Sequence, residues 1–310
     1  MRSLEAIRDK VDEVEAICSL EVGRNIGPLV ASARGGLNRA LTLIAAHGAP
    51  KSIGIASGCF IPWGSPPAAE TDGPVGAVLL ARALQQLGHH ACLVTDDLCV
   101  GAIIAARDAI DDWESVCPVC VATDDGSLRV TDGVLLEASI SSVVSVERLG
   151  PNDRGEIMSI GAEDRAEVSG WVHRFFQREG QETIGIGDGG NELGMGNLSR
   201  EVVASSIKHG ALIHCTVPAS ALIVSGCSNW GALGMVASLY LAYPEEVSAD
   251  LLSDELHNQI LCRLVVDGPA VDGVTGRNEA TVDGLPGGAT FEILAALRSL
   301  LRVSSRRAED

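Results

Sequence analysis

The amino-acid sequence predicts an α/β fold built on a mostly parallel sheet. Short apolar, β-prone runs alternate with stretches of helical periodicity, and loops rich in glycine and polar residues follow the β-prone runs. The chain has 310 residues, of which 46% are hydrophobic, so a substantial core can be buried. No internal repeat or domain-scale linker interrupts the alternation. We therefore expect a single domain over residues 1–310.

Residues 1–50 are expected to form a helical lead-in to that domain. Apolar residues recur at helical spacing in two segments, 1–22 and 25–47. The repeating positions are Leu4, Ile7, Val11, Val14 and Ile17 in the first segment, and Leu37, Leu41 and Ile44 in the second.

Strands and helices then alternate to the end of the chain. Strands are expected at 51–57, 91–95, 116–123, 142–146, 183–186, 212–217 and 222–224. Helices are expected near 75–87, 101–109, 163–178, 199–209, 231–242, 249–261 and 290–301. Ligands of open parallel sheets bind beyond the carboxyl ends of the strands, so the residues that follow each strand are functional candidates.

Composition excludes several classes of function. A net charge of −18 and 3% aromatic residues disfavour binding to nucleic acid or to an anionic membrane, and leave a small anionic molecule as the expected partner. The first ten residues mix both charge signs and lack the apolar core of a signal peptide, which favours a cytoplasmic protein. Nine irregularly spaced cysteines, Cys117 and Cys120 included, are expected to be free and buried. A homo-oligomer is left open.

The segment Ile184–Gly196 is the most informative stretch of the sequence. Asp188, Asn191 and Glu192 lie among six glycines, more than an ordinary turn needs, so we expect a shaped binding loop in which Gly189 and Gly190 approach a ligand. The spacing of its first glycines formally matches a dinucleotide fingerprint. Because the next helix begins only near residue 199, no nicotinamide cofactor is expected.

Carboxylates recur at the predicted strand ends. Crowded ionised carboxylates require a shared proton or cation, and oxygen ligands favour Mg²⁺, Mn²⁺ or Ca²⁺. The alternative for some of these acids is helix capping. Asp72 would cap the 75–87 helix, and for Asp96 and Asp97 both capping and ligand binding are left open. The predicted metal ligands are Glu70, Asp72, Asp188 and Glu192.

Three further polar residues are substrate-binding candidates. Arg148 follows a strand, and its planar guanidinium suits a carboxylate, although a surface ion pair is the alternative. Asn229 follows another strand in a glycine-bracketed segment and would orient a ligand. Arg277 lies in a long polar loop, 272–286, that would act as a lid.

Several sequence blocks together resemble the C-terminal domain family of D-glutamate cyclase. They are Glu70-Thr-Asp-Gly-Pro, Val146-Glu-Arg, the 185–196 glycine block, Ser228-Asn-Trp-Gly, Asp272-Gly-Val-Thr and Thr281-Val-Asp-Gly-Leu-Pro. The resemblance implies a three-layer, Rossmann-like, doubly wound sheet and conversion of D-glutamate to 5-oxo-D-proline with loss of water. It covers about residue 54 to the C-terminus. This chain has Gly287 where the family often has a histidine, and no counterpart of the eukaryotic enzyme's additional N-terminal domain or targeting segment is expected in it.

That chemistry assigns roles to the candidate residues. A neutral amine must attack a carboxylate, which requires a base and a group that stabilises oxyanion charge. Asp188 or Glu192 would be the base, Arg148 or a divalent metal ion the electrophile, and the loop amides the clamp. A divalent-metal-dependent phosphate ester hydrolase and a non-catalytic metabolite-binding protein are the alternatives.

Overall fold

The computed structural model describes residues 2–45, 50–110, 117–131, 139–286 and 288–306. The end of the predicted 25–47 helix, the first residue of the predicted 116–123 strand, and Gly287 lie outside these ranges.

A seven-stranded sheet in the order β6-β5-β4-β1-β7-β8-β9 forms the centre of the molecule. All neighbouring strands are parallel except β6, which is antiparallel to β5. The strands are β1 (Ser52–Ser57), β4 (His90–Thr95), β5 (Val119–Ala122), β6 (Leu128–Val130), β7 (Ser142–Val146), β8 (Glu182–Gly187) and β9 (Ala221–Val224). A short pair, β2 (Phe60–Ile61) and β3 (Ala68–Ala69), follows β1. The predicted parallel α/β sheet is confirmed.

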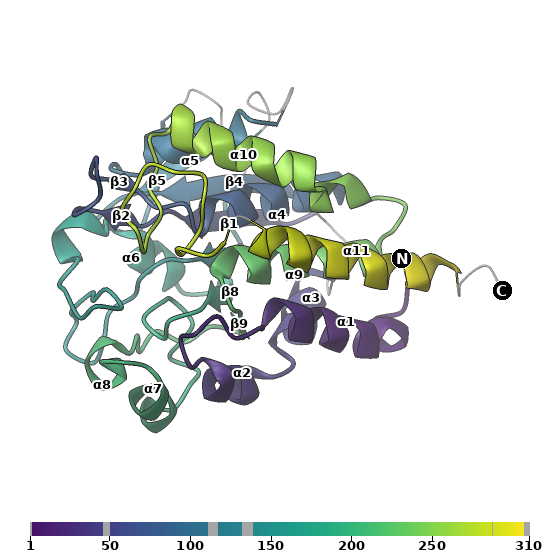
Figure 1. Cartoon of the computed structure of the whole chain (residues 1–310), viewed down its shortest axis with the longest axis horizontal. Helices are drawn as coiled ribbons and strands as arrows, with labels where there is room; N and C mark the ends of the chain where they lie inside the picture. Colours follow the sequence, from purple (N-terminus) through teal and green to yellow (C-terminus); the bar gives the residue numbers. More distant parts are fainter. Residues whose placement is uncertain (1, 46–49, 111–116, 132–138, 287, 307–310) are drawn as a thin grey trace.

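The chain winds outward from β1 in both directions. It first adds β4 and β5 on one side of β1, and then adds β7, β8 and β9 on the other side. The strand order therefore reverses between β1 and β7, whose last residues, Ser57 and Val146, are paired in register. Such a switch point opens a crevice beyond the strand ends, and the loops that follow the strands gather at this end of the sheet, on the left of Figure 1.

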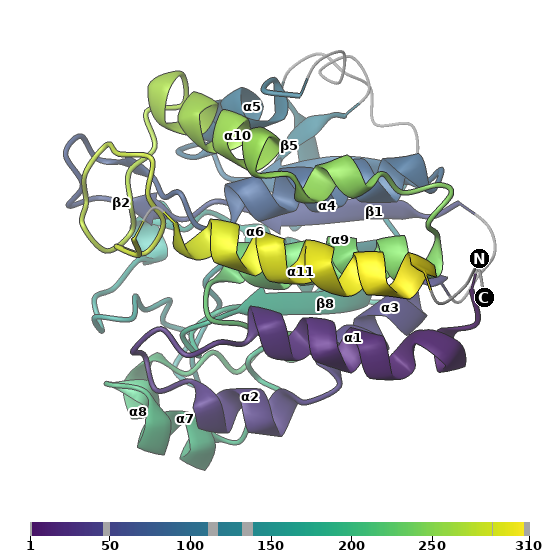
Figure 2. The same cartoon turned by 45° about the vertical axis from the view of Figure 1, so that its right-hand side comes forward.

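Helices cover both faces of the sheet. On one face pack α3 (Gly36–Ala45), α4 (Pro74–Gln86), α5 (Val100–Arg107) and α9 (Ser228–Ala242). Outside them lie α1 (Leu4–Cys18), α10 (Asp254–Val266) and α11 (Ala289–Arg306), of which α1 and α11 run side by side in Figure 2. The other face carries α2 (Gly27–Ala33), α6 (Val172–Phe176), α7 (Arg200–Ser206) and α8 (Gly210–Ile213). None of the described helices combines the length and apolar composition needed to cross a membrane.

The helical lead-in is an integral part of both layers. Gly36 allows α3 to approach β9 so closely that an added Cβ would lie 1.8 Å from the carbonyl oxygen of Leu222. Residues of α1 and α3 belong to the larger core, whereas Ile26 and Leu29 of the α2 region belong to the core on the opposite face. The segment between α1 and α2 therefore passes the end of the sheet at which the strand-end loops gather.

Two predicted elements are wrong. Residues 212–217 form no strand: α8 ends at Ile213, and Cys215 and Val217 then pair with backbone of the glycine loop rather than with the sheet. Residues 163–178 do not form the predicted long helix. Gly170 adopts a positive φ of 55°, and the helix that follows it, α6, has only five residues. In both segments, contacts made far along the chain override the local apolar pattern.

Candidate active site

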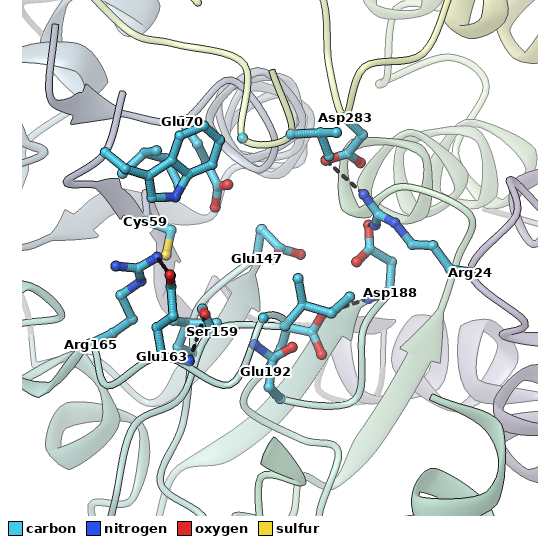
Figure 3. A pocket seen from close by; sticks show the side chains of 18 residues that line it. Arg24, Cys59, Glu70, Glu147, Ser159, Glu163, Arg165, Asp188, Glu192 and Asp283 are labelled. Atoms are coloured by element: carbon cyan, nitrogen blue, oxygen red, sulfur yellow. Dashed lines mark hydrogen bonds and ion pairs between the residues drawn. The ribbon is translucent and has the colours of Figure 1, made fainter. Parts of the chain in front are cut away.

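A pocket of about 390 Å³ lies at the switch point between β1 and β7. Loops from six parts of the chain line it. They contribute Arg24 from the segment after α1, Cys59, Ile61, Trp63 and Glu70 after β1, Glu147 and Leu149 after β7, Ser159, Ile160, Gly161, Glu163 and Arg165 before α6, Asp188, Asn191 and Glu192 after β8, and Gly273, Val274 and Asp283 before α11. Figure 3 shows these side chains converging on one space.

The glycine loop is folded around the carboxylate of Glu192. Oε1 of Glu192 accepts the backbone N–H groups of Asp188 at 3.0 Å and Gly189 at 2.6 Å, and Oε2 accepts that of Gly190 at 2.8 Å. A Cβ on Gly189 would lie 3.0 Å from Oε1, and Gly190 has a φ of 91°, so the glycines are needed for this return contact. These amides are therefore directed at Glu192, and the predicted amide clamp on a ligand finds no support here.

Asp72 and Asn229 connect the starts of two buried helices. Oδ1 of Asp72 accepts the N–H of Asn229 at 2.8 Å and Oδ2 accepts that of Ser228 at 2.9 Å, which caps α9. In return, Oδ1 of Asn229 accepts the N–H groups of Gly73 and Gly76 at the start of α4. Asn229 is held in the wall behind the pocket and does not line it. The capping alternative for Asp72 is therefore wrong as to the helix: Asp72 caps α9 and not the 75–87 helix that follows it.

Glu147 reaches the middle of the pocket from the end of β7 (Figure 3). Its φ of 52° is unusual for a residue with a side chain and typically costs about 1–3 kcal/mol, which marks the position as functionally constrained. The hydroxyl of Ser228 donates to Oε2 of Glu147 at 2.5 Å. Gly73 makes room for Glu147, because a Cβ there would lie 2.9 Å from the Glu147 Cβ.

Arg24 enters the pocket from the segment after α1. Its guanidinium contacts Oδ2 of Asp188 at 2.5 Å and Oδ1 of Asp283 at 2.9 Å, so it bridges the glycine loop and the 272–286 loop. The backbone that carries Arg24 is held by Glu21, whose Oε1 accepts the N–H groups of Gly23, Arg24 and Asn25. Arg24 is the strongest addition that the structure makes to the site expected from sequence.

Asp72, Glu147, Asp188 and Asp283 form a compact four-carboxylate group at this wall of the pocket. Oxygen atoms of Asp72, Glu147 and Asp188 lie within 4.8 Å of one another, and so do ligand atoms of Asp72, Asp283 and the thiol of Cys227. Hard divalent cations prefer such oxygen-rich sets. Of the predicted metal ligands, Asp72 and Asp188 belong to the group; Glu70 and Glu192 line the pocket outside it.

Crowding and burial favour the protonated carboxyls. Burial, followed by repulsion from Asp283, raises the pKa of Asp72 to about 7. Burial, followed by repulsion from Asp188, raises the pKa of Asp283 to about 7 and that of Glu147 well above its usual range. The pKa of Asp188 is also raised by burial, although Arg24 opposes the shift. The pocket thus holds carboxyls that retain protons near neutral pH unless a cation binds.

Besides Asn229, two further predicted site residues, Arg148 and Arg277, do not line the pocket. Arg148 is 2% exposed, and its guanidinium donates to Oδ2 of Asp96 at 2.7 Å and to the carbonyl oxygen of Ser169. The ion-pair alternative is therefore the one that the structure supports, in buried form. Arg277 is exposed and does not line the pocket, although its neighbours in the 272–286 loop do. Asp188, Gly189 to Asn191 and Glu192 are brought together as expected.

Sequence reasoning missed Arg24 and the roles of Glu147 and Asp283. Glu147 directly follows a predicted strand, and that position alone made it a candidate. Arg24 carried no such signal, because it lies between two lead-in helices and its partners are far away in the sequence. Its neighbour Gly23, with a φ of 96°, indicates a shaped turn only in retrospect.

Comparison with known proteins identifies the family. The model of the family described as "D-glutamate cyclase-like, C-terminal" matches residues 14–298, a range that includes Arg24 and every loop of the pocket. The chain belongs to this family. It is similar to the human protein named "D-glutamate cyclase, mitochondrial", with 27% identity over 89% of this chain and 49% of that protein. The chain thus spans about half the length of this curated relative. The family assignment made from the sequence blocks is confirmed.

All nine cysteines are free, and eight of them are buried, as expected. Cys59 lines the pocket, but burial, followed by the nearby Glu70 carboxyl, raises the pKa of its thiol well above the usual range. A thiol in this state is a poor nucleophile, because the thiolate is the reactive form. The chemistry of this D-glutamate cyclase-like pocket therefore centres on carboxylates.

Proposed function

We propose that this chain is a lyase that converts D-glutamate to 5-oxo-D-proline with loss of water. The observation that carries the proposal is a pocket at the sheet's switch point in which several buried carboxyls lie beside an arginine, within a chain of the D-glutamate cyclase-like family. Ring closure requires both proton acceptance and proton donation, and neighbouring carboxyls in different surroundings provide both.

In the proposed reaction, the amino nitrogen of D-glutamate attacks its own γ-carboxyl carbon. A new carbon–nitrogen bond forms and a carbon–oxygen bond breaks. The nitrogen loses two protons, and the departing oxygen gains two and leaves as water, so the site ends with the protons with which it began. Asp188 is the better base, because both oxygens of Glu192 already accept backbone N–H groups. Glu147, whose pKa is raised by burial and by Asp188, is the proton donor.

Arg24 takes the role that the sequence had suggested for Arg148. Its guanidinium lines the pocket, whereas that of Arg148 is buried against Asp96. A cationic fork at this position would stabilise the negative charge that develops on the carboxyl oxygen during attack. A divalent cation on the four-carboxylate group would supply the same stabilisation, and metal assistance is part of this proposal. The cellular location stays a prediction, since the relative is named mitochondrial.

The phosphate ester alternative has weaker support. Phosphate sites commonly use free backbone N–H groups of glycine loops, and here three such groups donate to Glu192. The charged residues of the lining are six acids and two arginines, and this acidic excess repels a phosphate dianion in the absence of a bound cation.

The test is incubation of the purified chain with D-glutamate, L-glutamate or a generic phosphate ester, with product analysis by chiral chromatography and phosphate release. Each reaction is run with Mn²⁺ and with EDTA. We expect 5-oxo-D-proline from D-glutamate, and a loss in kcat of about 100-fold or more in Asp188→Asn. Asp267→Asn, an exposed acid paired with Arg263, is the matched control and should keep full activity. Phosphate release without 5-oxoproline would reject the cyclase in favour of the hydrolase.

A further inference from the structure

Arg24 is the positive charge in direct contact with the four-carboxylate group (Figure 3). It pairs with Asp188 and Asp283, and its side chain is 19% exposed. The clustered ligand atoms form two sets that share Asp72. Asp188 belongs to the set with Glu147, and Asp283 belongs to the set with Cys227. The guanidinium therefore contacts one acid from each set.

The group retains unused ligand capacity. Oδ2 of Asp283 has no hydrogen-bond partner, although its side chain is only 7% exposed. A buried carboxylate oxygen without a donor is costly unless a further partner binds. Arg24 supplies one positive charge to four carboxyls, so either protons or a further cation must offset the negative charge that remains. Acidic crowding alone would not define a site, but a buried oxygen without a donor on a member of the group leaves room for a cationic ligand.

We propose that the four-carboxylate group binds a divalent cation, and that this cation and the Arg24 guanidinium occupy the carboxylates of Asp188 and Asp283 in turn. Arg24 is then the resident counter-ion of the empty site. The oxygen donors favour Mg²⁺ or Mn²⁺ over softer metals. The inference concerns binding and stands whether or not the proposed cyclase reaction occurs.

Electrostatics and contact geometry both indicate that a bound cation and the Arg24 guanidinium exclude each other. The Arg24 Nη1 atom lies 2.5 Å from Oδ2 of Asp188, so a cation bound to the Asp188 carboxylate would place two positive charges in close proximity. The Arg24 side chain can leave without unfolding its loop, because Glu21 holds the backbone N–H groups of residues 23–25 and makes no use of the guanidinium. Withdrawal therefore costs two ion pairs, and cation binding has to exceed that cost.

The test is calorimetric titration of Mn²⁺ into metal-stripped protein without substrate. Arg24→Gln removes the competing charge and should tighten Mn²⁺ binding by about tenfold or more. Asp283→Asn should weaken binding, both alone and combined with Arg24→Gln. The matched control is Arg165→Gln, which removes an arginine from the opposite side of the same pocket, where it contacts Glu163. Its effect should stay within about twofold, because long-range charge effects are screened.

Equal or weaker Mn²⁺ binding by Arg24→Gln would overturn the competition, and unchanged binding by Asp283→Asn would overturn the site. Circular dichroism of each variant checks that it is folded. If Arg24→Gln does not fold, Arg24→Lys replaces it: a single ammonium cannot fork between two acids, so Mn²⁺ affinity should still rise, by about threefold. No rise in that variant would equally reject the proposal. Because no substrate is present, a failed cyclase assay has no bearing on these outcomes.

Discussion

Asp72 and Asn229 cap each other's helices across the base of the pocket. Asp72, which precedes α4, accepts N–H groups at the start of α9, and Asn229, in the first turn of α9, accepts N–H groups at the start of α4. In chain order α4 comes after β1 and α9 comes after β9. The two helices pack against each other more extensively than any other pair of described helices. The reciprocal caps therefore fix Asp72 at the pocket wall at the same time as they align the two helices.

Replacement of Asn229 by alanine should destabilise the fold. It leaves the buried N–H group of Gly76 without its acceptor, whereas that of Gly73 keeps Oδ1 of Asp72, and a lost cap with an unsatisfied donor costs about 2 kcal/mol. Urea unfolding measures the difference. Asn258→Ala, at an exposed position on α10, is the control and should change stability by less than about 0.5 kcal/mol. A loss in Asn229→Ala no larger than in this control would show that the cap is dispensable.

Glu192→Gln should disorganise the glycine loop. The glutamine amide offers one acceptor oxygen in place of two, and its NH₂ group would face a backbone N–H. We expect a loss of about 2–3 kcal/mol in the free energy of unfolding. Chemical denaturation provides the measurement, with the exposed Glu201→Gln as its counterpart. Wild-type stability in Glu192→Gln would mean that the three contacts contribute little.

The four-carboxylate group should make stability fall as pH rises. The folded-state pKa of Asp283 is about 7, above its ordinary value of 3.8, so the folded protein holds a proton that the unfolded chain has already released. The unfolded state therefore binds fewer protons between pH 4 and 7, and the contribution of Asp283 to stability is lost progressively over that window. Asp283→Asn removes this loss.

The measurement is the Tm from pH 4 to pH 8 in EDTA. Relative to wild type, Asp283→Asn should gain stability as the pH increases and level off above pH 7. Taking the difference between the two proteins removes the contributions of other groups. Asp267→Asn provides the surface control. A difference independent of pH would contradict the raised pKa.

His257 should act in the opposite direction. It is buried in α10, neither ring nitrogen has a hydrogen-bond partner, and its ring meets Phe291 edge to face. Burial lowers its pKa from 6.5 to about 4, so the unfolded chain binds a proton before the folded one, and stability is lost as pH falls from 6.5 to 4. His257→Leu should unfold at a higher temperature, with the gain larger at pH 5 than at pH 8. An equal change at both pH values would argue against a neutral buried ring.

The sequence itself determined the sheet and the loops that lead to the site. Buried β-prone runs ending in polar residues produced six parallel strands near their expected places, and Asp188 to Glu192 lie at the end of β8 as predicted. This information is local: apolar periodicity selects strands and helices, and glycine permits a shaped turn. Chain order then places the strand ends at one edge of the sheet.

Only the tertiary structure decided which charges meet. Arg24 was invisible to local reasoning because its partners Asp188 and Asp283 belong to distant loops, and Arg148 was misplaced because a buried acid, Asp96, takes its guanidinium. The glycine loop likewise closes on its own Glu192. A side chain's partner depends on which segments approach each other in three dimensions. Because burying an unpaired charge is costly, a buried charged side chain turns to the nearest partner, which its position in the sequence does not reveal.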